Sequence, residues 1–392
     1  MDKNAKIYIA GHRGLVGSAI WKNLQDKGYT NLIGRTHKEL DLLDGMAVRK
    51  FFDEEQPEYV FLAAAFVGGI MANSIYRADF IYKNLQIQQN IIGESFRHNV
   101  KKLLFLGSTC IYPRDAEQPM KEDVLLTSPL EYTNEPYAIA KIAGLKMCES
   151  FNLQYGTNYI AVMPTNLYGP NDNFDLERSH VLPAMIRKIH LAHCLKEGNW
   201  EAVRKDMNQR PVEGVNGDSS KEDILAILKK YGISETEVTL WGTGTPLREF
   251  LWSEEMADAS VFVMEHVDFK DTYKEGSKDI RNCHINIGTG KEITIRQLAE
   301  RIVETVGYQG KLTFDSSKPD GTMRKLTDPS KLHALGWHHK IEIRNEVTVN
   351  MLLAECFFAN SIFFLAIMII KLAIMIISFA IMIIQLAISI IC

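Results

Sequence analysis

Cysteine is scarce in this chain, and the few cysteines do not fall into pairs. A disulfide framework or a zinc site would show short, repeated cysteine spacings, and these are missing. Unpaired cysteines are typical of a reducing compartment. The N-terminus also lacks the apolar run of a secretory signal, so we expect a cytoplasmic protein without a bound metal. The cysteines are Cys110, Cys148, Cys194, Cys283, Cys356 and Cys392.

The chain also lacks a strong excess of charge of either sign. Its formal net charge is −4 over 392 residues. Nucleic acids and anionic membrane surfaces attract strongly basic proteins, so neither is expected to bind the body of this chain. A chain of this length can bury a large core, and two domains are the natural expectation.

A glycine turn stands near the N-terminus, between a short apolar strand at residues 6–10 and a helical stretch at residues 18–27. Gly11, Gly14 and Gly17 are spaced as G-x-x-G-x-x-G. Such glycines let the backbone turn tightly and approach a pyrophosphate, which then rests on the N-terminus of the following helix. The position of this turn, between a strand and a helix, predicts a dinucleotide site.

An acidic residue is missing where a site for NAD would have one. The second strand is expected at residues 31–34, and an aspartate or glutamate after it would hold the ribose 2′-hydroxyl. Here Arg35 and His37 follow the strand, and Arg13 lies in the glycine turn. Basic groups suit a 2′-phosphate, so NADP(H) is favoured over NAD as the cofactor. Asp41, which follows this segment, is expected to contact the adenine of the cofactor.

Strands and helices alternate through the first part of the chain. This alternation predicts an α/β fold with a Rossmann-like doubly wound parallel sheet over residues 1–170, to which segments near 238–290 return. Residues 171–343 are expected to form mostly a smaller α/β substrate-binding lobe. A polar, irregular insertion near 193–238 interrupts that lobe, with one helix near 220–230. An alternative interpretation of residues 208–219 is a mobile linker.

Three polar residues are expected to converge at the end of one buried strand. Ser108 closes the apolar run at residues 103–107, and active sites of open α/β sheets lie at such carboxyl ends. Tyr137 and Lys141 are four residues apart, so they share one face of a helix. A lysine charge beside a phenol favours proton exchange with a nearby hydroxyl or carbonyl. An ordinary helix face would explain the tyrosine and lysine alone, but the glycine turn favours the catalytic interpretation.

Together these motifs resemble the extended short-chain dehydrogenase/reductase family over residues 5–343. The branch that the chain resembles converts GDP-4-keto-6-deoxy-D-mannose to GDP-L-fucose, by 3,5-epimerisation and then reduction of the 4-keto group with NADPH. A GDP-sugar substrate and a homodimer, formed through the helices at residues 79–96 and 137–155, are implied by this resemblance. The matching stretches are GHRGLVGSAI, AAAFVGGI, FLGSTCIYP, NEPYAIAKIAG, MPTNLYGPNDNF, WGTGTPLREF and KPDGTMRKLTD.

The resemblance also implies a role for individual residues. Ser108, Tyr137 and Lys141 match the reductase triad of the family, and Cys110 and His180 match its epimerisation pair. Implied substrate contacts are Lys188, Trp241, Arg248 and Asp320. Implied cofactor contacts are Gly11, His12, Arg13, Gly14, Leu15, Val16, Gly17, Leu106, Gly107, Ser108, Thr109, Lys141, Pro164, Thr165, Asn166, Leu167 and His180.

Two other functions stay open. Another sugar-nucleotide epimerase or a 4,6-dehydratase could use the same fold, although dehydratases tend to show Thr-Asp-Glu where this chain has Ser108-Thr109-Cys110. The second is a non-catalytic NADP sensor or membrane-tethered scaffold. Such proteins usually lose the tyrosine or the lysine, and this chain keeps both.

The C-terminal residues 344–392 are unlike the family. Residues 365–392 repeat one heptad four times, as LAIMIIK, LAIMIIS, FAIMIIQ and LAISIIC. This apolar span is long enough for a membrane anchor. A nearly identical repeated heptad is also what a translated tandem DNA repeat after a frameshift or read-through would give, and this explanation is favoured over an anchor. A membrane is therefore a partner only if the tail is a true anchor.

Overall fold

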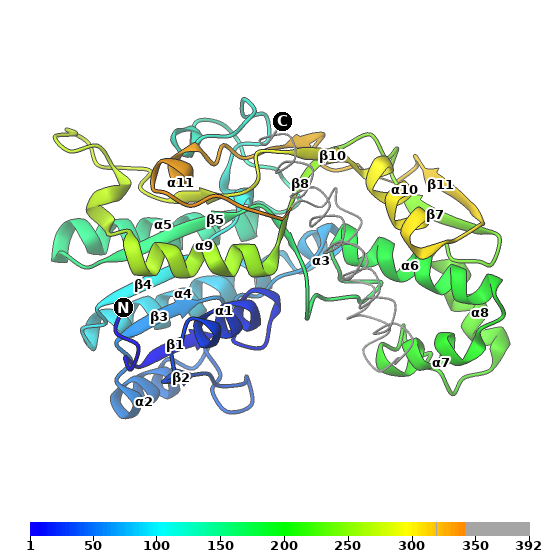
Figure 1. Cartoon of the computed structure of the whole chain (residues 1–392), viewed down its shortest axis with the longest axis horizontal. Coiled ribbons are helices and arrows are strands. Elements are labelled where there is room, and N and C mark those ends of the chain that lie inside the picture. The colour runs from blue at the N-terminus through cyan, green and yellow to red at the C-terminus, as the bar shows by residue number, and fades with distance from the viewer. Residues whose placement is uncertain (319, 342–392) are drawn as a thin grey trace, which may run out of the picture.

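The computed structural model describes residues 1–318 and 320–341. A six-stranded sheet, in which every neighbouring pair of strands runs parallel, forms the larger lobe (Figure 1). Its strands are almost entirely apolar and buried, as expected for a parallel sheet covered on both faces. The predicted Rossmann-like parallel sheet is therefore confirmed. In sheet order its strands are β2 (Leu32–Ile33), β1 (Ile7–Ala10), β3 (Tyr59–Leu62), β4 (Lys102–Leu106), β5 (Tyr159–Pro164) and β9 (Ile285–Ile287).

The strand order reverses direction between β1 and β3. From β1 the chain steps outward to β2, and from β3 it steps the other way through β4 and β5. In the register, Tyr8 of β1 lies between Ile33 and Val60 of its neighbours. Ligands of open α/β sheets bind at such a switch point, outside the carboxyl ends of the strands. The glycine turn, Ser108 and Thr165 all follow carboxyl ends of this sheet.

Helices cover both faces of the sheet (Figure 1). Helices α1 (Leu15–Asp26) and α9 (Ser253–His266) pack against each other and share one apolar core with the sheet. Helices α2 (Gly45–Glu55), α4 (Arg77–Arg97) and α5 (Glu135–Tyr155) contribute to a second core on the opposite face. The short helix α3 (Ile70–Ile75) precedes α4.

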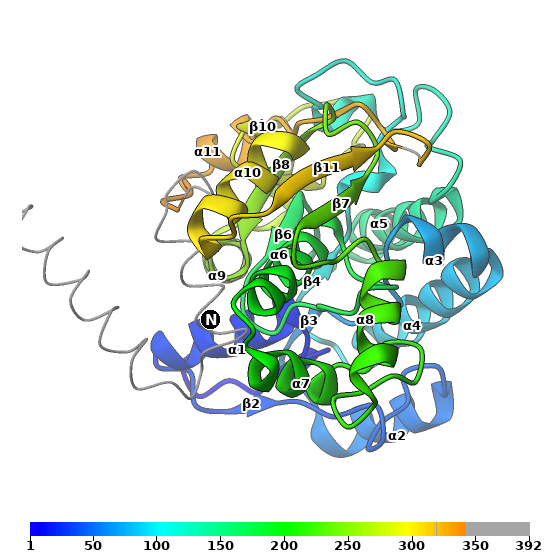
Figure 2. The same cartoon turned by 90° about the vertical axis from the view of Figure 1, so that its right-hand side faces the viewer.

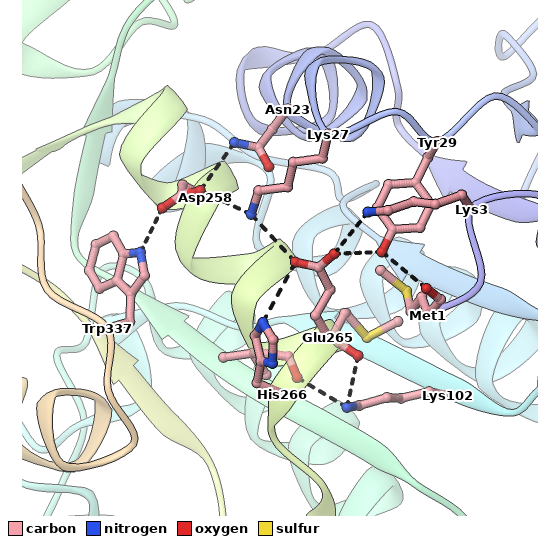
Figure 3. A network of polar contacts seen from close by, with 12 residues as sticks. Met1, Lys3, Asn23, Lys27, Tyr29, Lys102, Asp258, Glu265, His266 and Trp337 are labelled. Atoms are coloured by element: carbon pink, nitrogen blue, oxygen red, sulfur yellow. Dashed lines mark hydrogen bonds and ion pairs between the residues drawn. The ribbon is translucent and has the colours of Figure 1, made fainter.

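Polar contacts fasten α9 to the N-terminal part of the chain (Figure 3). The carboxylate of Glu265 accepts a hydrogen bond from the Tyr29 hydroxyl at 2.5 Å and lies 3.4 Å from Nζ of Lys3. Lys27 bridges Glu265, at 3.5 Å, and Asp258, at 3.1 Å. These groups are partly exposed, so they contribute less to stability than the apolar core beneath them.

A smaller lobe lies beside the larger one, and Figure 2 views it face on. Two small sheets and four helices surround a core of their own. In the first sheet, β8 (Leu247–Trp252) pairs with β6 (Asn166–Tyr168), β10 (Glu292–Thr294) and β12 (Arg324–Lys325). In the second, β7 (Glu237–Trp241) pairs with β11 (Lys311–Asp315). The helices are α6 (Val181–Lys196), α7 (Trp200–Gln209), α8 (Lys221–Lys230) and α10 (Ile295–Val306).

Four short segments complete the described chain. They are η1 (Thr109–Ile111), η2 (Glu122–Val124), η3 (Phe269–Thr272) and α11 (Ser330–Ala334).

The insertion is more regular than its sequence predicts. The helix expected near residues 220–230 is confirmed as α8, but it is not the single helix of this segment. Helix α6 extends to Lys196, and α7 follows at Trp200–Gln209. Asn199 caps α7 by accepting a backbone hydrogen bond at 3.1 Å, and Val203 is fully buried. Asp206 of α7 holds the buried Arg187 of α6 at 2.8 Å. The polar composition hid α7 because its few inward-facing residues include this ion pair.

Two predictions concern parts that the structure does not test. The heptad repeat and the choice between an anchor and a translated DNA repeat lie outside the described residues. The domain boundaries also stay predictions. Within residues 1–318 and 320–341, no helix is both long and apolar enough to cross a membrane.

Candidate active site

The glycine turn is as tight as its sequence predicts. Gly11 has φ +85°, and a Cβ on Gly17 would come within 2.1 Å of the Gly11 carbonyl oxygen. Gly14 precedes α1 and provides no side-chain cap for the first turn of the helix. The amide groups at this helix start therefore stay available to an anion such as a pyrophosphate. The turn fits a dinucleotide.

Two of the three predicted basic residues lie near an acidic residue that sequence reasoning missed. Glu39 is exposed, and hydrogen bonds from Thr36 lower its pKa, with a smaller contribution from the charges of Arg13 and Arg35. Arg35 is not free, because it pairs with Glu55 at 2.5 Å. Arg13 is exposed, so its guanidinium is the more accessible of the two.

The other two predicted residues of this region contact each other. His37 and Asp41 are both exposed, and their side chains lie 3.6 Å apart. Asp41 also accepts a hydrogen bond from the backbone of Leu43 at 3.0 Å. The carboxylate thus faces its own loop.

The loops after β1, β4 and β5 carry the remaining predicted cofactor contacts. The ring of His12 lies 5.5 Å from that of Trp21, tilted by 44°, and fills the space in which Gly34 has no side chain. Thr165 is buried, and Asn166 donates a hydrogen bond to the Glu249 carbonyl at 2.8 Å. The loop after β5 is thereby tied to β8.

Ser108 and Tyr137 meet where β4 ends. The Ser108 hydroxyl oxygen accepts a hydrogen bond from the Cys110 backbone at 3.2 Å, which leaves its own hydrogen free to donate. Burial raises the pKa of Tyr137 well above its usual value, and the nearby Cys110 raises it further, while a hydrogen bond with Ser108 lowers it. The phenol therefore keeps its proton at neutral pH and can donate it.

Lys141 lies one helical turn after Tyr137, as predicted. Its Nζ lies 5.7 Å from the centre of the Tyr137 ring and donates a hydrogen bond to the Leu106 carbonyl at 2.8 Å. Burial lowers the pKa of Lys141 to about 7. Its charge is therefore sensitive to any anion that binds nearby.

Cys110 is the middle residue of η1 and has two polar contacts that sequence reasoning missed. Nδ2 of Asn134 lies 3.4 Å from its sulfur, and Nζ of Lys325 lies 3.3 Å from it. A pocket opens beside the three residues. Asn134 and Lys325 lie in the NEPYAIAK and KPDGTMRKLTD stretches. Both stretches were recognised in the sequence, but neither residue was assigned a role.

His180 is the N-cap residue of α6. Solvent reaches its side chain, although protein atoms crowd the region around the imidazole. This crowding lowers its pKa, and the charge of Lys325 lowers it further. Lys325 thus acts on both members of the predicted pair, His180 and Cys110. The structure gives no direct contact between the two.

The predicted substrate contacts come from the smaller lobe. Burial lowers the pKa of Arg248, while the charges of Asp320 and Cys110 raise it, so each of these two groups lies near Arg248. Asp320 accepts two hydrogen bonds from Thr243, at 2.7 and 2.8 Å. Trp241 is half exposed at the end of β7.

The fourth predicted substrate contact, Lys188, stands on a different element, α6. It is buried on α6, and burial lowers its pKa to about 8. Among the described residues, no hydrogen bond or ion pair joins it to Arg248 or Asp320. Within residues 1–318 and 320–341, no group of three or more His, Cys, Asp or Glu side chains could hold a metal ion.

The parallel sheet, the glycine turn and the buried tyrosine–lysine pair define a nucleotide-dependent oxidoreductase or epimerase. The chain belongs to the NAD dependent epimerase/dehydratase family, whose model matches residues 7–210 and 211–288. It is 51% identical over 344 residues to GDP-L-fucose synthase 1 of Arabidopsis thaliana, covering 88% of this chain and 91% of the plant protein.

Two solved structures from Campylobacter jejuni are also similar. A GDP-6-OMe-4-keto-L-xylo-heptose reductase is 47% identical, with a TM-score of 0.84, and 90% of this chain aligns with 97% of that chain. A GDP-mannoheptose C4 reductase with NADP bound is 46% identical, with a TM-score of 0.77, and 90% of this chain aligns with 98% of that chain.

Proposed function

We propose that this chain converts GDP-4-keto-6-deoxy-D-mannose to GDP-L-fucose, by 3,5-epimerisation followed by reduction of the 4-keto group. One observation carries the proposal: the Cys110 backbone amide donates a hydrogen bond to the Ser108 hydroxyl oxygen, and Cys110 lies close enough to Tyr137 for its charge to raise the pKa of the phenol. A proton-transfer group and a carbonyl-reducing pair therefore share one site. The similarity to a GDP-L-fucose synthase supports the same conclusion.

We infer NADP(H) as the cofactor. The uncapped start of α1 and the tight glycine turn fit its pyrophosphate, and the charges of Arg13 and Arg35 both reach Glu39 in the region where a 2′-phosphate would bind. A similar solved structure holds NADP. When bound, the reduced cofactor would supply the hydride for C4 of the sugar.

In the reduction, Tyr137 donates a proton to the C4 oxygen while Ser108 donates a second hydrogen bond to it. Burial keeps Tyr137 protonated, and the Leu106 carbonyl holds Lys141 beneath its ring. Charge that develops on the C4 oxygen thus meets donors that are already in place, which is the main requirement for stabilising an oxyanion.

In the epimerisation, we assign Cys110 as the base and His180 as the acid. Proton removal next to the ketone leaves an enolate, whose charge falls on the C4 oxygen held by Tyr137 and Ser108. Return of a proton on the opposite face inverts the carbon. Thiols and imidazoles are residue types suited to such proton transfers.

The GDP group would bind between the lobes. Arg248 and Lys188 provide the cations that a diphosphate needs, Asp320 an acceptor and Trp241 an exposed aromatic face. The pKa of Lys188 is lowered only by burial, so a bound diphosphate would favour its charged form.

A second candidate is reduction of a GDP-4-keto sugar without epimerisation. The similarity to two GDP-heptose reductases from C. jejuni favours it. Cys110 and His180 would then take no part in the reaction. The two candidates differ in the configuration of the product at C3 and C5.

Loss of NADPH absorbance on addition of GDP-4-keto-6-deoxy-D-mannose tests the proposed function. Steady consumption supports an enzyme of this class. Cofactor binding without turnover would instead support the NADP sensor.

We further propose a homodimer through α4 and α5. These helices pack together, yet both expose large apolar side chains. Tyr82 and Phe96 are 66% and 37% exposed, and Ile139 and Leu153 are 42% and 50% exposed. The members of each pair are 14 positions apart, close to four helical turns, so each pair lies on one helix face. A second copy of the chain would cover these faces.

A further inference from the structure

Two hydrogen-bond donors converge on the sulfur of Cys110. Nζ of Lys325 lies 3.3 Å from it, and Nδ2 of Asn134 lies 3.4 Å from it. An ammonium has hydrogens to donate and no lone pair to accept with. The sulfur is thus an acceptor toward both neighbours, and an anionic sulfur fills that role better than a protonated one.

The lysine reaches this sulfur from a distant part of the chain, and the small sheet determines its place. Lys325 of β12 pairs directly with Arg248 of β8. Residues paired across neighbouring parallel strands point to the same face of a sheet. Since the charge of Cys110 also acts on Arg248, both cations lie on the face toward η1.

A buried carboxylate fixes β12 against β8. Glu249 follows Arg248 and is fully buried. It accepts hydrogen bonds from the backbone amide and hydroxyl of Thr327, at 2.9 and 2.6 Å, and from the amide of Gly290 at 2.7 Å. The strand that carries Lys325 is therefore held against β8, which fixes the backbone position from which its side chain reaches the sulfur.

We propose that Lys325 is a positioning residue that holds Cys110 as a thiolate, with Asn134 as the second donor, ready to take a proton from the sugar. The proposal rests on the proposed epimerase function. No carboxylate pairs with Lys325 in the part of the chain that the structure describes, so its charge is available to the sulfur. The other charged or titratable groups in this region are Arg248 of β8, Tyr137 of α5, His180 at the start of α6, and Tyr112, Arg114, Glu131 and Arg324 of the adjoining pocket.

The proton transfer balances without a further reactant. The thiolate takes the proton from the carbon next to the ketone and becomes a thiol, and the electron pair of the broken bond moves to the C4 oxygen. The ammonium of Lys325 does not change. The same charge, added to burial, lowers the pKa of His180. A lowered pKa makes the protonated imidazole of His180 a stronger acid, which suits the return of a proton to carbon.

Alkylation of Cys110 tests this proposal without the sugar. Iodoacetamide reacts with thiolates, and mass spectrometry of the Cys110 peptide gives the labelling rate of the full-length protein between pH 6 and 9. Lys325→Met should slow labelling at pH 7 roughly tenfold or more, and a higher pH should restore the rate. Lys325→Arg should stay near the native rate because it keeps the charge. Lys121→Met, at an exposed lysine before η2, is the matched control.

Each outcome decides the matter. An unchanged pH profile in Lys325→Met would overturn the proposal, and so would an equal loss in Lys325→Arg. A raised KM for the GDP-sugar with unchanged labelling would also overturn it, because Lys325 would then contact the substrate. The expected labelling pattern in a protein that does not epimerise the sugar would support the thiolate and reject only the proposed function. NADPH binding by each variant checks its fold.

Discussion

Lys141 donates its hydrogen bond to the Leu106 carbonyl, 2.8 Å away, and not to the phenol of Tyr137. The strand end, and not the tyrosine, therefore holds the ammonium in place. Removal of the phenol oxygen should leave both Lys141 and the cofactor loop after β4 where they are.

Tyr137→Phe should abolish most of the reduction while NADPH binding stays nearly native. Only the proton donor to the C4 oxygen is lost, and loss of a general acid costs about 10²–10⁴ in rate. Single-turnover NADPH oxidation measures the rate, and fluorescence titration measures binding. Turnover like that of the native protein would remove Tyr137 from its assigned role.

The cofactor preference should depend on Arg13 and Arg35. The native chain should bind NADPH more tightly than NADH, and replacement of both arginines by alanine should narrow the difference. A hydrogen bond to a charged group contributes about 1.5–3 kcal/mol, so each arginine accounts for roughly tenfold or more in affinity. Because Glu55 already holds Arg35, Arg13→Ala should have the larger effect of the two.

Titration of both cofactors into each variant measures these affinities. Lys38→Ala, at an exposed lysine of the same loop, is the control. Equal affinity of the native protein for NADH and NADPH would show that these arginines do not select a 2′-phosphate.

Cys110→Ser should separate the two half-reactions. The substitution keeps size and position but replaces a thiol with a hydroxyl that is far harder to ionise. Proton removal next to the ketone should become very slow, while Ser108, Tyr137 and Lys141 remain for the hydride step. The variant should slowly oxidise NADPH with the unepimerised sugar.

Deuterium exchange from solvent measures the first half-reaction of this variant, and NADPH absorbance measures the second. Exchange at C3 and C5 at the native rate would make Cys110 a packing residue.

The quaternary structure should depend on the exposed faces of α4 and α5. A charge in place of Tyr82 or Leu153 would have to be buried in the dimer, so Tyr82→Glu and Leu153→Glu should give monomers. Sedimentation velocity distinguishes the two states. Leu225→Glu, at an exposed leucine of α8 in the other lobe, is the control and should stay dimeric. A native protein that sediments as a monomer would reject this interface.

The sequence predicted the parallel sheet well because its signals are local. Strands such as β4 and β5 are short apolar runs, and the glycine turn between β1 and α1 needs residues that allow φ +85° at Gly11. The apolar pattern failed for α7. The helix packs through an ion pair between Asp206 and Arg187, so its buried side includes charge.

The site could be predicted from the sequence where its residues follow the end of a strand or share one face of a helix. Ser108, Tyr137 and Lys141 could be placed together from the strand end and the helix period. Lys325 could not, because it reaches Cys110 through the pairing of β12 with β8, which no local pattern encodes. The ion pair between Arg35 and Glu55 was missed for the same reason.

Incubation of the native protein with GDP-4-keto-6-deoxy-D-mannose and NADPH in deuterium oxide tests most directly whether one site performs both steps. Nuclear magnetic resonance of the product reads both the configuration and the label at each carbon. We predict GDP-L-fucose with deuterium at C3 and C5, because Cys110 and His180 exchange protons there before hydride reaches C4. A reduced 6-deoxy sugar with unchanged configuration and no deuterium at C3 and C5 would contradict this, and would identify a 4-reductase without epimerase activity.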